Sequence, residues 1–159
     1  GETRAASTFV PLDIARRETD LPALAAAWRA ERRTADSIRR RLLDHWIRWA
    51  DTATDPVPWS GRVSVLHWGG VPIIAMPGEI FARTALNLRA EIDGPAFVLA
   101  YADAVPGYVP PRGEYRHGGY EVDEAHRFFG MPGAFAPGSA ERLADAARSL
   151  LRGSGPDVT

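Results

Sequence analysis

The sequence contains no cysteine, no lysine and no long apolar run. Without cysteine the chain can form neither disulfides nor thiolate metal sites, and the redox compartment stays open. All 19 basic residues are arginine, and together with the many alanines this bias indicates a GC-rich coding sequence rather than arginine chemistry. No apolar stretch approaches the roughly 18 residues that a transmembrane helix needs. The sequence therefore predicts no transmembrane segment.

The formal net charge is −1 at pH 7, which gives no electrostatic reason to expect nucleic acid or an acidic membrane as a partner. With 159 residues, 45% of them hydrophobic and 25% charged, the composition is that of an ordinary globular protein. We therefore expect a single domain over residues 1–159. The chain starts at Gly1 without an apolar signal region, as expected of a mature or excised polypeptide. Secreted and cytoplasmic locations both stay open, as does the oligomeric state.

Predicted strands and helices alternate along the chain. Strands are expected at 7–14, at 62–68 and 71–76 in a hairpin with the turn Gly69-Gly70, and at 96–102. The last of these, AFVLAYA, is apolar throughout, as in a strand that is covered on both faces. Helices are predicted after caps at Asp20 and Thr34, at about 80–92 and at 139–152. This alternation predicts an α/β fold in which helices flank a layered mixed sheet.

Glu79 stands where the predicted strand 71–76 gives way to a helix. A carboxylate there faces the positive end of the helix dipole and free backbone N–H groups, which favour its ionised form. An ordinary first-turn glutamate has the same position, so this alone does not make Glu79 a metal ligand.

Tyrosines concentrate in one irregular segment, GYVPPRGEYRHGGYE at 107–121, which holds three of the chain's four tyrosines. The fourth, Tyr101, lies just upstream. Prolines and glycines exclude a regular helix from this segment. It follows the strand at 96–102, and the carboxyl ends of neighbouring strands are where sites assemble in open α/β sheets. Glu79 and Tyr108 are therefore expected to meet at one edge of the sheet, unless the tyrosines serve only packing.

Two segments together resemble the neutral ceramidase family, in the C-terminal part of its catalytic domain. They are GVPIIAMPGEIFARTALNLRAEI (70–92) and the tyrosine-rich segment 107–121. In that family a strand runs into Pro-Gly-Glu and a helix, and a later strand leads to a Gly-Tyr or His-Tyr pair. A Tyr-Glu pair follows twelve residues on. Here the pairs are Gly107-Tyr108 and Tyr120-Glu121, and the resemblance extends over about 60–150, and more loosely over 8–60.

The resemblance implies a role for three residues. Glu79 matches the carboxylate ligand of the family's zinc ion, and Tyr108 matches its tyrosine ligand. Tyr120 matches the tyrosine that donates a hydrogen bond to the oxygen of the scissile amide. The family hydrolyses the amide of N-acylsphingosine, and zinc supplies it with an activated water at neutral pH.

Two histidine ligands of the family have no counterpart here. The chain's histidines are His45, His67, His117 and His126, and no pair of them has the spacing of a zinc-binding motif. The resemblance therefore implies an incomplete half of a larger catalytic domain, with a zinc site only half supplied by this chain. An N-terminal chain or segment of the same enzyme would complete it.

These observations predict a zinc-dependent amide hydrolase that cleaves a ceramide-like N-acyl amine to a fatty acid and an amine. Whether the substrate is ceramide itself or another N-acyl amine stays open. The alternative is a non-catalytic homologue of the same fold that binds a lipid or a protein. The apolar segment FFGMPGAFAP (128–137) would line an acyl pocket in the first case, or its phenylalanines serve only as plugs of the core or an interface.

Overall fold

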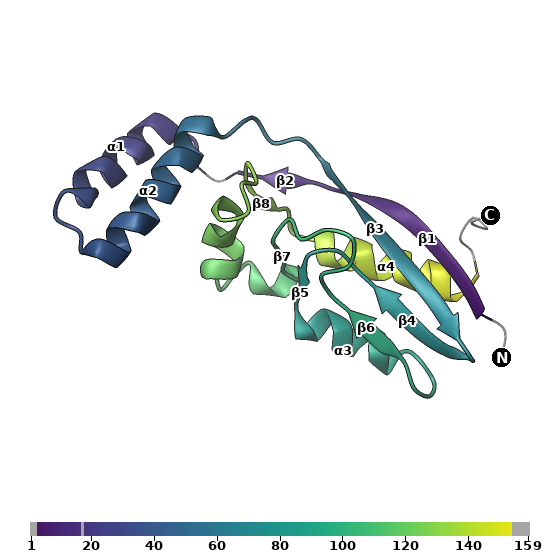
Figure 1. The fold of residues 1–159 in the computed structure, drawn as a ribbon. Helices are drawn as coiled ribbons and strands as arrows, with labels where there is room; N and C mark the ends of the chain where they lie inside the picture. Colours follow the sequence, from purple (N-terminus) through teal and green to yellow (C-terminus); the bar gives the residue numbers. More distant parts are fainter. Residues whose placement is uncertain (1–2, 17, 154–159) are drawn as a thin grey trace.

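The computed structural model describes residues 3–16 and 18–153, and a four-stranded sheet in the order β1-β3-β4-β6 forms its centre (Figure 1). The strands are β1 Thr3–Leu12, β3 Trp59–Trp68, β4 Val71–Ala75 and β6 Phe97–Leu99. β1, β3 and β4 are antiparallel neighbours, whereas β6 runs parallel to β4. The predicted α/β class with a mixed sheet is thus confirmed.

The hairpin β3–β4 has the predicted two-residue turn. Gly69 and Gly70 both have positive φ, 58° and 89°, which is the conformation of a hairpin turn that matches the strand twist. The strand expected at 7–14 is shifted: β1 pairs with β3 from Thr3↔Trp68 to Leu12↔Trp59, and Ile14 belongs to the separate strand β2.

Two helices, α3 Ala82–Ala90 and α4 Ser139–Leu151, pack on one face of the sheet. The strand residues that face them form a single buried cluster with the helices' Leu88, Leu143 and Ala147. Those strand residues are Val10, Leu12, Val63, Val65 and Ile74, which the register places on the same side. The main core therefore lies between the sheet and α3 and α4.

The strand predicted at 96–102 differs most from expectation. β6 covers only Phe97–Leu99, and the side chains of Phe97 and Leu99 are 58% and 48% exposed. The expectation that this strand is covered on both faces is therefore wrong for the part of the chain that the structure describes. The reason is tertiary: β6 is an edge strand, and α3 and α4 lie on one face only.

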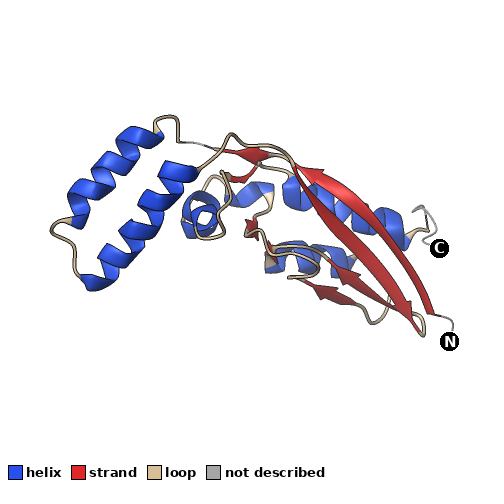
Figure 2. Cartoon of the chain, turned by 45° about the horizontal axis from the view of Figure 1, so that its top comes forward, coloured by secondary structure: helices blue, strands red, loops and turns tan. Residues whose placement is uncertain are grey.

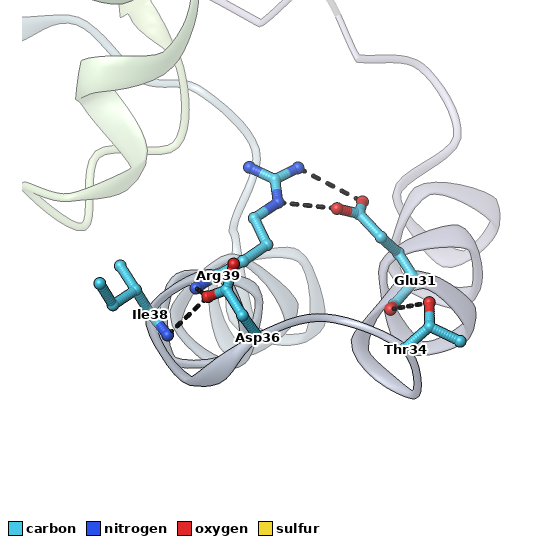
Figure 3. Close-up of polar contacts among 5 residues, drawn as sticks. All are labelled: Glu31, Thr34, Asp36, Ile38 and Arg39. Carbon is cyan, nitrogen blue, oxygen red and sulfur yellow. Dashed lines mark hydrogen bonds and ion pairs between the residues drawn. The ribbon is translucent and has the colours of Figure 1, made fainter.

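The helices α1 Leu21–Arg32 and α2 Ser37–Thr52 form a hairpin at one end of the molecule, away from the termini (Figures 1 and 2). Asp20 caps α1 as predicted, accepting from the Ala23 N–H at 2.9 Å. The cap of α2 is Asp36 rather than the predicted Thr34. Figure 3 shows why: Asp36 Oδ1 accepts from Ile38 N and Arg39 N, whereas the Thr34 hydroxyl donates to Glu31 O.

Two small two-stranded sheets lie outside the four-stranded sheet. β2 Ile14–Ala15 pairs with β8 Ala134–Phe135, and β5 Glu79–Ile80 pairs in parallel with β7 Tyr108–Val109. Single turns complete the tyrosine-rich segment and its continuation: η1 Arg112–Glu114, η2 Tyr120–Glu124 and η3 Ala125–Arg127. In the part of the chain that the structure describes, no helix combines the length and apolar character required to cross a bilayer.

Candidate metal-binding site

Glu79 and Tyr108 are direct partners in the ladder of β5 and β7. Glu79 was expected at the start of a helix that begins near residue 80. Instead it lies on β5, and α3 begins only at Ala82 after the cap residue Phe81. The Glu79 N–H donates to Gly107 O at 2.9 Å, so its backbone is satisfied by the tyrosine-rich segment rather than by the helix. The pairing brings the carboxylate and the Tyr108 phenol side by side.

The segment that carries Glu79 is held along its whole length by the segment that follows β6. Met76 N donates to Leu99 O, Tyr101 N to Gly78 O, and Gly78 N to Ala104 O, each at 2.9 Å. Gly78 has φ +77°, and a Cβ there would lie 2.9 Å from both Gly107 O and Val109 Cγ2. Only glycine fits this close approach, so the Pro-Gly-Glu motif sets how near Glu79 comes to Tyr108.

Tyr101 is a third member of the site, which the sequence had not singled out. Its hydroxyl donates to Glu79 Oε2 at 2.8 Å. Its backbone lies in the left-handed region with φ 60°, which is uncommon and costly for an aromatic residue. Asp103 has φ 64° and forms an ion pair with Arg62 on β3, which anchors the same bend. A signal was present in the sequence: Tyr101 follows closely on the strand beside the one that leads to Glu79.

Tyr120 approaches from the turn η2 and completes an aromatic row. Its ring centroid lies 5.9 Å from that of Tyr108 and 5.8 Å from that of Phe128. Phe81 packs edge-on against the other side of Tyr108 at 6.2 Å. Gly119, with φ 98°, lets the chain turn just before Tyr120. The structure thus brings together all three residues that the resemblance singled out.

The tyrosines are held in their protonated form. A hydrogen bond with the Glu79 carboxylate, with some desolvation, raises the pKa of Tyr108 to about 12. The same carboxylate raises the pKa of Tyr101 through its hydrogen bond. Desolvation, followed by the charges of Glu79, Glu121 and Glu124, raises the pKa of Tyr120. At neutral pH the group therefore offers one carboxylate surrounded by phenol O–H donors.

No cationic side chain neutralises Glu79 within the described part of the chain. Its polar partners are phenols, while arginines elsewhere, such as Arg29, Arg39, Arg62 and Arg148, are paired with other carboxylates. The site is open to the surface, since Tyr101 is 59% and Tyr120 43% exposed. Two oxygen atoms that could ligate a metal, from Glu79 and Tyr108, thus lie together, and the negative charge of the carboxylate has no cationic partner among the described residues. Such a set of oxygen ligands suits a hard or borderline cation.

The described residues do not complete a metal site. Nowhere among them do three His, Cys, Asp or Glu side chains come together in a metal-binding group. His45 Nε2 lies 3.0 Å from Arg127 O, and His117 Nε2 accepts from Arg116 at 2.9 Å. His126 is 7% exposed and packs edge-on against Trp49. The described residues could therefore fill two positions of a metal coordination sphere, through Glu79 and Tyr108.

The phenylalanines of the 128–137 segment separate into different roles. Phe128 lies beside Tyr120 and is 39% exposed. Phe129 lies over Gly107, where a Cβ would come within 3.2 Å of its ring, and Phe135 is 3% exposed in the main core. Only Phe128 is placed to meet a ligand at the site, and the other two act as plugs. Tyr115, in the same segment as Tyr108 and Tyr120, points elsewhere and donates to Phe135 O at 2.7 Å.

Neither a protein-family model nor a curated protein sequence matches this chain. Among solved structures, the chain is similar to neutral ceramidase from Pseudomonas aeruginosa, with a TM-score of 0.53 and 18% sequence identity. The fold is that of part of a neutral ceramidase. The match covers 100% of this chain and 30% of the ceramidase chain. It confirms the resemblance at the level of the fold, while the roles of Glu79, Tyr108 and Tyr120 remain predictions.

Proposed function

We propose that this chain is the portion of a zinc-dependent amide hydrolase that carries one metal-binding edge and one oxyanion donor. The observation that carries the proposal is the direct pairing of Glu79 with Tyr108, with no cationic partner for the carboxylate within the described residues. A carboxylate beside a phenol at an exposed surface adds little to stability, but the two oxygens are suitable as two of the ligands of a metal ion. The ceramidase-like fold favours zinc as the ion.

Glu79 and Tyr108 would hold the ion, and two histidines would come from another segment or chain. When bound, zinc would lower the pKa of a water molecule to about 7 and so supply a nucleophile at neutral pH. Tyr101 would keep the Glu79 carboxylate in one orientation through its hydrogen bond to Oε2. Such outer partners commonly change metal affinity by roughly 10- to 100-fold when they are removed.

Tyr120 would act on the substrate rather than on the metal. A phenol is protonated at neutral pH, as a hydrogen-bond donor must be, and desolvation raises the pKa of Tyr120 further. A donor aimed at the oxygen of an amide carbonyl stabilises the charge that develops there in the transition state. Phe128 beside it offers an exposed apolar surface, which suits the acyl chain of an N-acyl amine such as a ceramide.

The test uses the complex of this chain with the polypeptide encoded immediately upstream of it. Zinc per complex is measured by elemental analysis, and hydrolysis is followed with a fluorescent N-acylsphingosine and with simpler N-acyl amines. We expect one zinc ion per complex and hydrolysis of at least one substrate. Glu79→Gln and Tyr108→Phe should lower zinc content and turnover together. Zinc bound equally by wild type and both variants would disprove the ligand assignment.

The alternative is a non-catalytic homologue that binds a lipid or a protein. It is favoured by the absence of a third metal ligand from the described residues and by the exposed apolar side chains of β6. A complex that contains no zinc and hydrolyses none of the amides, yet binds N-acylsphingosine vesicles, would establish it.

A further inference from the structure

One face of the four-stranded sheet has no helix on it. By the strand register, Leu66, Ile73 and Phe97 form one row across β3, β4 and β6. Ser64, Ala75 and Leu99 form the next row, and Phe9 on β1 lies on the same side. We call this surface the open face. On the opposite face of the same strands, Val63, Val65 and Ile74 belong to the buried core with α3 and α4.

The open face is apolar over β4 and β6, and it carries Ser64 on β3. Phe9 is 67% exposed and Phe97 is 58% exposed, whereas Leu66 and Ile73 are half-buried. Arg62, which lies opposite Phe9 on the same side, is paired with Asp103. A contiguous apolar sheet face of this kind is expected to be covered in the working protein.

The open face leads directly to the candidate site. Leu99 lies two residues before Tyr101, and the Tyr101 hydroxyl donates to Glu79. A layer that covered β3, β4 and β6 would therefore end beside the Glu79 carboxylate. The site in turn needs donors that the described residues do not supply.

Two kinds of polypeptide could cover the open face, a second copy of this chain or a different polypeptide, and the histidines distinguish them. A second copy of this chain would offer one exposed histidine, His117. His45 and His126 are fixed inside its own fold against Arg127 O and Trp49, and His67 Nε2 is buried. It would bring no pair of histidines to the edge at Glu79. A different polypeptide that carries histidines can cover the face and complete the site at once.

We propose that the open face is the docking surface for the polypeptide that supplies the remaining metal ligands, through an apolar layer packed on β3, β4 and β6. The proposal rests on the proposed function, since it identifies the partner by the ligands that the site lacks. Sheets packed face to face bury such side chains at a spacing of about 10 Å.

The experiment combines the full chain with the separately purified polypeptide encoded immediately upstream, and measures association by analytical ultracentrifugation. We expect a one-to-one complex and a monomeric free chain. Phe97→Glu with Leu99→Glu should weaken association by at least ~100-fold, because two charges would be buried without partners. Leu86→Glu is the matched control: Leu86 is 67% exposed on α3, so association should be unchanged.

Hydrogen exchange of the wild-type complex tests the same surface if the double variant fails to fold. Complex formation should protect amides of β3, β4 and β6 and leave the exposed side of α3 unchanged. Equal loss of association in Leu86→Glu, a homodimer broken by the double variant, or no binding would each overturn the proposal. A complex through this face without zinc or hydrolysis would refute the proposed function alone. Zinc and hydrolysis with no effect of the double variant would refute the docking surface alone.

Discussion

Two aromatic clusters meet at Phe128: a tryptophan cluster of Trp28, Trp46 and Trp49, and a tyrosine cluster around Glu79. They differ in whether the charged group inside them has a partner of opposite charge. Phe128 contacts Trp46 of the α1–α2 hairpin and Tyr120 of the candidate site, at centroid distances of 6.3 and 5.8 Å. In the tryptophan cluster, the Arg127 guanidinium lies 5.2–5.5 Å from the rings of Trp28, Trp46 and Trp49. Its charge is neutralised by Glu18 at 2.5 Å.

The tyrosine cluster surrounds a charge of the opposite sign that has no such partner. Glu79 is met by phenols alone, and the rings around it are partly exposed. The tryptophan cluster thus neutralises its own charge through Glu18, which is typical of a structural element. The tyrosine cluster leaves a carboxylate ready for a cation, which is typical of a site. The variants below test this difference, from the largest expected effect to the smallest.

Trp46→Ala should destabilise the fold by about 3–5 kcal/mol. Trp46 is 6% exposed and contacts Trp28, Phe128, Arg39 and Arg127, so its removal leaves a large cavity at the centre of the tryptophan cluster. Urea denaturation measures the loss. Trp68→Ala is the control, because Trp68 is 71% exposed and its loss should cost under about 0.5 kcal/mol in the isolated chain. Similar losses in both variants would contradict a structural role for the cluster.

Tyr120→Phe should have the opposite profile, with little effect on stability and a fall in kcat of about 10²- to 10³-fold in the assembled enzyme. The variant removes a donor used in the transition state and leaves both proposed metal ligands in place, so zinc content should not change. Steady-state kinetics with an N-acyl amine and metal analysis measure the two effects.

Tyr115→Phe is the matched control for Tyr120→Phe, from the same segment. It removes the hydrogen bond to Phe135 O and should cost about 1 kcal/mol of stability with kcat retained. A larger loss of kcat for Tyr115→Phe than for Tyr120→Phe would contradict the assignment of the site.

His126→Leu should flatten the acid dependence of stability. Burial beside Trp49 lowers the pKa of His126 from 6.5 to about 4, against the opposing charges of Glu18 and Asp123 and with the help of Arg127. Below pH 6.5 the unfolded chain therefore binds a proton that the folded chain takes up only near pH 4. The contribution of neutral His126 to the free energy of unfolding is fully present above pH 6.5, and up to roughly 3 kcal/mol of it is lost as the pH drops to 4. Urea denaturation at pH 7, 5.5 and 4 measures it, and equal slopes for wild type and variant would refute this account.

Asp36→Ala should cost about 1 kcal/mol, because it removes the side-chain oxygen that accepts from two N–H groups at the start of α2 (Figure 3). Thr34→Ala should cost only a few tenths, since its hydroxyl donates to one exposed carbonyl of α1. Thermal unfolding ranks the two. The reverse order would restore Thr34 as the cap, and neither variant should change turnover.

Part of the candidate site was accessible from the sequence. The position of Glu79 and Tyr108 after successive strands predicted that they would meet, and β5 and β7 pair them directly. Tyr101 was missed as a site member, whereas Phe128 was included only within the segment 128–137 that was expected to line an acyl pocket or to serve as a plug. Tyr101 reaches Glu79 only because a bend with positive φ, tied to β3 through Arg62 and Asp103, reverses the chain after β6. No local pattern specifies that bend.

What the sequence determined by itself is local. The Gly69-Gly70 turn, the Asp20 cap and the amphipathic helix α4 each depend on residues within a few positions of one another, whose backbone preferences act within one or two turns. Tertiary structure decided the rest. The apolar sequence of β6 cannot tell which of its faces is covered, because that depends on where α3 and α4 pack. The charge of Glu79 likewise becomes distinctive only when the fold surrounds it with phenols and leaves it no cationic partner among the described residues. The physical reason is that the register of the strands decides which distant residues become neighbours, and their spacing in the chain does not show it.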